Sequence, residues 1–194
     1  MEFQLRFELT NEEYGDFNVY TVWSAPEQKK LRKKTFLSTL FLTLGFAILG
    51  VFISQQLSTA SKQRSLVDPV IIVIVVVVAA TVTLITYNRV ASKTKSKAIQ
   101  LVEKEDNNHI LSDAEMEFRE DGFTHTDSKS KSIQTWQSII KYIDVNNSFY
   151  LYINSVQAFI IPKRVFASTG DIERFHKFLE EKIPLSSSFR SMGI

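Results

Sequence analysis

The uncharged segment from Pro69 to Tyr87, PVIIVIVVVVAATVTLITY, constrains the fold of this chain more than any other feature. As a β-strand, its nineteen residues would extend roughly 60 Å, far beyond the length of an ordinary strand. As an α-helix, they would span about 29 Å, which matches the roughly 30 Å hydrocarbon core of a bilayer. We therefore predict a membrane-spanning helix over 69–87, although its many valines and isoleucines would favour a strand in water.

A second uncharged segment of the same length runs from Thr35 to Ile53 and predicts another spanning helix. Five bases stand directly before this first span, namely Lys29, Lys30, Arg32, Lys33 and Lys34. Four more bases follow the second span, whereas the residues between the spans carry only two. The positive-inside rule therefore places both termini in the cytoplasm. The first basic cluster is also a candidate contact for anionic lipid headgroups.

Small residues are expected to mark the contact between the two spans, because lipid tails give apolar helices no hydrophobic reason to associate. The candidate packing residues are Thr39, Thr43, Ala47, Gly50, Ala79 and Thr83. If Thr35 and Tyr87 lie at the same depth, Thr39 meets Thr83 and Thr43 meets Ala79. The alternative is that these small residues only reflect common membrane composition.

The amino-terminal segment 2–9 alternates strictly between polar and apolar residues, which predicts a half-buried strand. A strand of this length is not stable alone, so Leu5 and Phe7 are predicted to be buried against the carboxy-terminal domain. Pairing across a dimer is the alternative.

Two capping boxes are predicted next, one formed by Thr10 with Glu13 and one by Ser24 with Glu27. The helix that follows Thr10 carries an aromatic stripe, Tyr14, Phe17, Tyr20 and Trp23. This stripe either rests on the bilayer interface or packs on the protein's own domain.

Short extended segments separated by turns at Asp121–Gly122 and Asn146–Asn147 follow the second span. The segment 169–183 has apolar residues at helical spacing, with Thr169 as a candidate cap. We therefore predict an α+β domain, a small bent antiparallel sheet or barrel closed by a carboxy-terminal helix, which the amino-terminal strand joins.

The predicted organisation is thus a membrane helical hairpin attached to one cytoplasmic domain. Its parts are an amino-terminal strand and juxtamembrane helix (1–34), a first span (35–53), an extracytoplasmic loop (54–68), a second span (69–87), a connector (88–110), the domain (111–183) and a flexible tail (184–194).

Charge and motif content exclude several function classes. The chain has 23 basic and 21 acidic residues, and the excess of bases lies at the membrane flanks, so nucleic-acid binding is not predicted. Cysteine is absent, which excludes disulfides and thiol catalysis. The three histidines are scattered, and no nucleotide, nucleophile or metal motif occurs. We predict no catalytic residue, no cofactor, no metal and no enzymatic activity.

Four segments, MEFREDGF, QTWQSIIKYI, FYLYI and FIIPKRVF, resemble the carboxy-terminal domain of YcxB-like bacterial membrane proteins. The front half, EEYGDFNVYTVWSAPEQKK followed by two spans, is also similar to that family. The resemblance implies a pleckstrin-homology-like cytoplasmic domain in the bacterial plasma membrane, and it lends no catalytic residues. The matching motif positions are Phe118, Gly122, Trp136, Ile139, Pro162, Lys163, Arg164 and Phe166.

Lys163 and Arg164 form a basic pair directly after a predicted strand. They are candidate contacts for a lipid headgroup or an acidic partner; the alternative is a solvated or helix-capping role.

The leading hypothesis is a membrane-anchored binding module that recruits or senses a protein partner at the inner membrane surface. The alternative is an immunity or resistance protein against a membrane-active bacteriocin or toxin. A homo-oligomer is compatible with either function.

Overall fold

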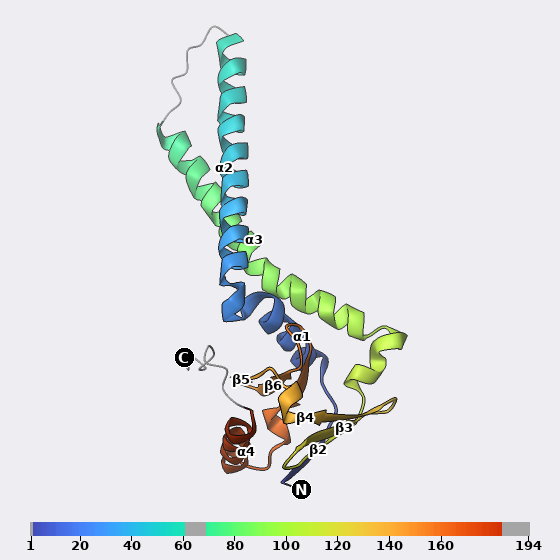
Figure 1. Ribbon diagram of the computed structural model, residues 1–194. Coiled ribbons are helices and arrows are strands. Elements are labelled where there is room, and N and C mark those ends of the chain that lie inside the picture. The colour runs from blue at the N-terminus through green and yellow to red at the C-terminus, as the bar shows by residue number, and fades with distance from the viewer. Residues whose placement is uncertain (1, 61–68, 184–194) are drawn as a thin grey trace. The chain divides into compact units, whose positions relative to one another are not determined.

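The computed structural model describes residues 2–60 and 69–183 (Figure 1). The chain divides into two compact units. The first combines the amino-terminal segment up to Thr21 with the chain from Lys95 onward, and the second comprises Val22–Thr94. Part of the predicted loop, 61–68, and the predicted tail, 184–194, lie outside the described residues.

Two long helices, α2 (Lys29–Ala60) and α3 (Pro69–Val102), dominate the second unit, and the end of α3 belongs to the first. Two segments are long and apolar enough to cross a membrane: Pro26–Ile53, which begins just before α2, and Val73–Val102 of α3. Helix α2 continues past the predicted end of the first span at Ile53 as far as Ala60. The helical hydrogen bonding thus extends beyond the uncharged segment into the polar residues that follow it.

The predicted capping box of Ser24 with Glu27 does not form. A π-helical turn, η1 (Tyr20–Ser24), is followed by a short 3-10 helix, η2 (Pro26–Gln28), which begins after Ala25 without a side-chain cap. Instead, the Arg32 guanidinium donates hydrogen bonds to the carbonyl oxygens of Trp23 and Ala25, at 2.5 and 2.9 Å. A charged side chain therefore holds the backbone where a hydroxyl cap was predicted.

Helices α2 and α3 meet at Thr43 and Thr83, whose hydroxyl oxygens lie 3.0 Å apart. Thr83 and Ala79 are buried, as expected of packing residues. The predicted register, in which Thr39 meets Thr83 and Thr43 meets Ala79, is wrong by about one helical turn. The prediction assumed that Thr35 and Tyr87 lie at the same depth, and the threonine pair shows that they do not. One hydroxyl can donate to the other while the second donates to a carbonyl oxygen of its own helix, that of Thr39 for Thr43 or that of Ala79 for Thr83.

The other predicted packing residues of α2 make looser contacts. Ala47 lines a small apolar hollow together with Val75 and Val76 of α3. A Cβ atom added at Gly50 would have no neighbour within 4 Å. Close packing is therefore found at the threonine pair and does not extend along the whole predicted stripe.

In the first unit, the strand β1 (Phe3–Phe7) begins a four-stranded antiparallel sheet. It pairs with β2 (Ala114–Phe118), and β3 (Gly122–Thr126) and β4 (Lys131–Thr135) follow in order. The prediction that the amino-terminal strand joins the carboxy-terminal domain is confirmed, and the pairing lies within one chain. Leu5 and Phe7 are buried, as the alternating pattern predicted.

The remaining strands, β5 (Lys141–Val145), β6 (Ser148–Tyr152) and β7 (Ala158–Pro162), form a separate three-stranded antiparallel sheet. Pro162 ends β7, which is an edge strand, so its missing N–H leaves no ladder bond unmade. Helix α4 (Thr169–Lys182) follows. Its cap is Ser168, which has an extended backbone and accepts the Asp171 N–H, rather than the predicted Thr169.

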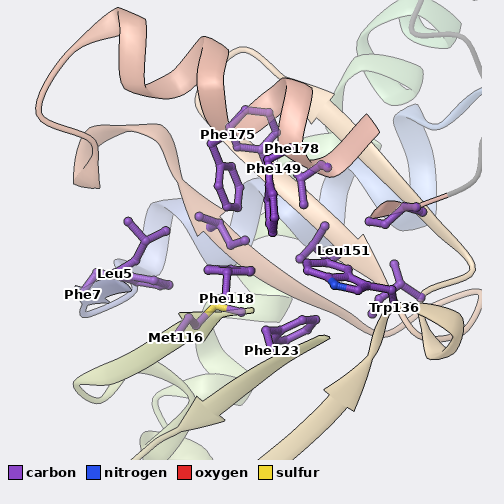
Figure 2. Close-up of a cluster of buried hydrophobic side chains, with 14 residues drawn as sticks. Leu5, Phe7, Met116, Phe118, Phe123, Trp136, Phe149, Leu151, Phe175 and Phe178 are labelled. Atoms are coloured by element: carbon purple, nitrogen blue, oxygen red, sulfur yellow. The ribbon is translucent and has the colours of Figure 1, made fainter. Parts of the chain in front are cut away.

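Figure 2 shows side chains from both sheets and α4 meeting in one aromatic core. The ring of Phe118 lies 5.0 Å from that of Phe175, centroid to centroid, and Phe149 lies 5.4 Å from the same ring. Trp136 is buried against Phe178, and its indole N–H donates to the carbonyl oxygen of Arg119. Trp136, one of the motif positions that resemble the YcxB-like family, is thus a core residue.

Helix α1 (Asn11–Val19) begins at the predicted capping box, in which Thr10 and Glu13 each bond the other's backbone N–H. Its Phe17 packs edge-on against Tyr150 of β6, and Tyr20 also contacts Tyr150. Strand β6 is consequently buried on both faces, one toward the core and one beneath α1. For Phe17 and Tyr20, the aromatic stripe packs on the protein's own domain.

Candidate functional site: a cavity between the two sheets

A cavity of about 180 Å³ opens in the first unit, between the two sheets. Residues of β2 and β3 line it from the four-stranded sheet, and residues of β7 line it from the three-stranded sheet. The covering segments are the amino-terminal arm, residues 2–21, and a 3-10 helix, η3 (Glu105–Leu111), that connects α3 to β2. The cavity is thus covered by the two segments that connect the sheets to the apolar helices.

Most of the cavity wall is apolar. The amino-terminal arm contributes Phe7, Leu9 and Phe17, and the sheets contribute Met116 and Ile160. Phe7, Phe17, Met116 and Ile160 are themselves buried, so their positions are fixed by packing on both sides. Such a wall favours an apolar or aromatic occupant, because contact with it removes apolar surface from water.

Three polar side chains, those of His109, His125 and Asp127, also line the cavity. The His125 ring lies 5.2 Å from the ring of Phe159, centroid to centroid. Burial lowers the pKa of His125 below its ordinary value, and the nearby Asp127 only partly opposes this effect. The imidazole is therefore neutral near pH 7, with one N–H donor and one nitrogen acceptor.

Asp127 is held by the hairpin turn between β3 and β4. Its carboxylate accepts hydrogen bonds from the N–H groups of Lys129 and Ser130, each at 2.7 Å, and from the Ser130 hydroxyl. Burial alone would raise the pKa of Asp127, but these hydrogen bonds lower it below its ordinary value. The charge of Asp127 makes the cavity unfavourable for an anion.

Two sets of ion pairs hold α1 over the domain. Arg164 donates to both carboxylate oxygens of Glu13, at 2.7 and 3.0 Å, and to the carbonyl oxygen of Glu8. Lys95, near the end of α3, pairs with Glu12 and Asp16. Burial alone would raise the pKa of Glu13, but the hydrogen bonds from Arg164 and Thr10 lower it below its ordinary value.

Gly15 allows α1 to approach the end of α3 closely. A Cβ atom at this position would lie 2.8 Å from Cγ of Lys95 and 3.2 Å from its Cε. Asn11 adds a hydrogen bond of 2.9 Å from its side-chain amide to the Glu103 carboxylate. The segment that precedes the apolar helices and the segment that follows them are therefore joined within the first unit.

The predicted basic pair makes its observed contacts inside the domain. Lys163 pairs with Asp144 at 2.5 Å and lies over the Phe149 ring, while Arg164 holds the amino-terminal arm. In the basic cluster before the first span, Lys29, Lys30, Lys33 and Lys34 are exposed, whereas Arg32 is half-buried against backbone carbonyls. Lipid contact by these residues stays a prediction.

Sequence reasoning missed this cavity because its lining residues come from six separate elements. It also treated the histidines as scattered, yet the fold brings His109 and His125 to the same cavity. One residue could have indicated the site from the sequence: His125, a titratable side chain within the short extended segment FTHTD. Within residues 2–60 and 69–183, no group of three or more histidine and acidic side chains could hold a metal ion.

The fold and the cavity define a class: an α+β domain of two antiparallel sheets and a closing helix, attached to two apolar helices. Residues 118–179 match the family model of YcxB-like protein, so this region is a YcxB-like domain and the resemblance seen in the sequence is confirmed there. No curated protein and no solved structure matches the chain significantly.

Proposed function

We propose that this protein is a membrane-anchored binding module of the bacterial plasma membrane. Two spanning helices hold a non-catalytic cytoplasmic domain at the inner membrane surface, where the domain senses or recruits a partner. The basic residues at both ends of the hairpin support the orientation, because positive charge is retained on the cytoplasmic side. The exposed lysines of the first cluster would contact anionic lipid headgroups.

The order of the strands along the chain is the observation that carries this proposal. Strand β1 precedes both apolar helices, whereas its partner β2 follows them. Five residue pairs join the two strands, from Phe3 with Phe118 to Phe7 with Ala114. A chain that completes one sheet from both sides of an apolar pair has both ends on one side of the membrane, which requires an even number of spans.

The domain is further proposed to be pleckstrin-homology-like, as the YcxB-like resemblance implies. A four-stranded sheet, a three-stranded sheet and one carboxy-terminal helix support this assignment. The cavity between the sheets supports a binding role, since it combines an apolar wall with a few polar groups. No feature of the described residues favours the alternative role in immunity or resistance.

Cysteine accessibility tests this topology, and the chain has no native cysteine to interfere. Gln56 is exposed near the end of α2, and Ser128 lies in the hairpin turn between β3 and β4. We expect Gln56→Cys to react with a membrane-impermeant maleimide in intact cells. Ser128→Cys should react only after the membrane is permeabilised. Labelling of Ser128→Cys in intact cells would contradict the proposal.

A further inference from the structure

Size limits what the cavity between the sheets can hold. Its volume is about 180 Å³. An engineered protein cavity of about 150 Å³, lined by leucine, isoleucine and phenylalanine, stays dry and binds benzene. The space therefore suits one aromatic ring with a small substituent, and it is too small for a nucleotide or a folded peptide segment.

The chemistry of the wall selects among molecules of that size. Phe7, Phe17 and Phe159 present aromatic rings to the cavity, and aromatic rings favour edge-to-face or offset contacts with another ring. The ionised Asp127 disfavours an anionic molecule. A neutral aromatic ring satisfies both conditions.

His125 supplies a specific polar contact. Within the part of the chain that the structure describes, its imidazole nitrogens make no hydrogen bond, and the half-buried ring lines the cavity. A hydroxyl group that bonds one of these nitrogens takes the place of water there, so a ligand with a hydroxyl is preferred over one without. A hydroxyl on the ring would meet this requirement, because it can both donate and accept.

We propose that the cavity between the sheets binds a neutral, single-ring aromatic molecule of the phenol class, with its hydroxyl on His125 and its ring against Phe159. This inference rests on the proposed function of the domain as a binding module and names the chemistry of its ligand. Because Tyr14 and Phe17 of α1 also line the cavity, an occupied cavity stabilises α1 on the three-stranded sheet.

Ligand binding can be tested with 4-fluorophenol, observed by fluorine NMR on the full chain in lipid nanodiscs. We expect saturable binding to the unmodified protein. Ala158→Leu places a larger side chain in the cavity and should abolish that binding. The matched control is Ala167→Leu, at an exposed position outside the cavity, which should bind as the unmodified protein does.

A second variant tests the contribution of the hydrogen bond without filling the cavity. It also tests the proposal if Ala158→Leu fails to fold. His125→Phe keeps a ring beside Phe159 but removes both nitrogens. The variant should therefore bind 4-fluorophenol roughly two- to tenfold more weakly than the unmodified protein does, whereas its affinity for fluorobenzene should be unchanged. Equal signals from all variants and from empty nanodiscs would overturn the proposal, since they would show partitioning into lipid. If the cysteine labelling pattern holds in that case, the membrane-anchored module stands and only the ligand assignment fails.

Discussion

Gly122, at the start of β3, shows how one residue decides whether two strands can meet. Its φ is positive, at 158°, as the Asp–Gly turn predicted. The stronger constraint is space, because a Cβ atom there would overlap the carbonyl oxygen of Gln134 and lie 2.9 Å from its carbonyl carbon. These are backbone atoms of β4, held by the sheet, so they cannot move aside as a flexible side chain would.

Replacing Gly122 with alanine should therefore destabilise the domain by about 1–3 kcal/mol, the usual cost of forcing extra atoms into a packed site. The measurement is thermal unfolding of the full chain in detergent. Gly170→Ala is the matched control, because a Cβ atom near the start of α4 would meet only the Ser168 hydroxyl oxygen at 3.6 Å. Equal unfolding temperatures for the two variants would contradict the overlap argument.

His125 should make the stability of the domain depend on pH near neutrality. Burial lowers its folded-state pKa below the ordinary value of 6.5, so the unfolded chain binds more protons as pH falls. The free energy of unfolding should decrease as pH drops from 7 toward 5. The other titratable groups at the cavity are Tyr14, His109 and Asp127, and Asp127 titrates well below this window because its pKa is lowered from 3.8.

Denaturant unfolding of the full chain at pH 5, 6 and 7 measures this dependence. His125→Gln should flatten the pH profile, since it removes the proton that the unfolded state takes up. An unchanged slope in that variant would assign the dependence to another group.

At the scale of elements, α1 links the two chain segments that flank the apolar pair. Its Phe17 packs on Tyr150 of the three-stranded sheet, and its Glu13 pairs with Arg164, which follows that sheet. Its Glu12 and Asp16 pair with Lys95 near the end of α3. These ion pairs each have one well-exposed partner, so each contributes little, about 0–1 kcal/mol. The aromatic contacts therefore supply most of the attachment, and the ion pairs fix its register.

The contact between α2 and α3 is a second prediction at this scale. Thr43→Cys combined with Thr83→Cys should form a crosslink within one molecule, because the two hydroxyl oxygens lie 3.0 Å apart. Phe41→Cys with Leu84→Cys is the control pair, since both of these side chains are exposed. Crosslinked monomers and dimers are separated by gel electrophoresis of oxidised membranes. Products that are only dimeric would indicate a contact between chains instead.

For the whole molecule, the main consequence is that the folded domain is discontinuous in sequence. Strand β1 and helix α1 come from before the apolar pair, while strands β2 to β7 come after it. Without the amino-terminal arm, Met116 and Tyr150 would lose the side chains that cover them. The carboxy-terminal part is therefore incomplete by itself.

A fragment of residues 95–183 should aggregate or bind hydrophobic dyes when it is expressed alone. Adding a peptide of residues 2–21 should restore protease resistance, because it supplies both β1 and α1. A peptide with Leu5→Asp and Phe17→Asp is the control and should not restore it, since both residues are buried in the assembled domain. A stable fragment without any peptide would show that the arm is dispensable.

Local patterns in the sequence were sufficient for most elements. The lengths of the two uncharged segments, the alternation over 2–9, the Thr10 capping box and the helical spacing over 169–183 each depend on near neighbours in the chain. Backbone geometry links such patterns directly to helix or strand. The burial of Leu5 and Phe7 also followed, because a short amphipathic strand needs a partner sheet.

Only the tertiary structure decided which distant residues meet. It paired Thr43 with Thr83, tied Arg164 to Glu13, and brought His109 and His125 to one cavity. These contacts depend on the register of packed elements, and a shift of one helical turn or one strand residue changes the whole set. The sequence by itself determined the elements of this protein, and three-dimensional packing determined its candidate site, because a cavity is formed by side chains that share no local pattern.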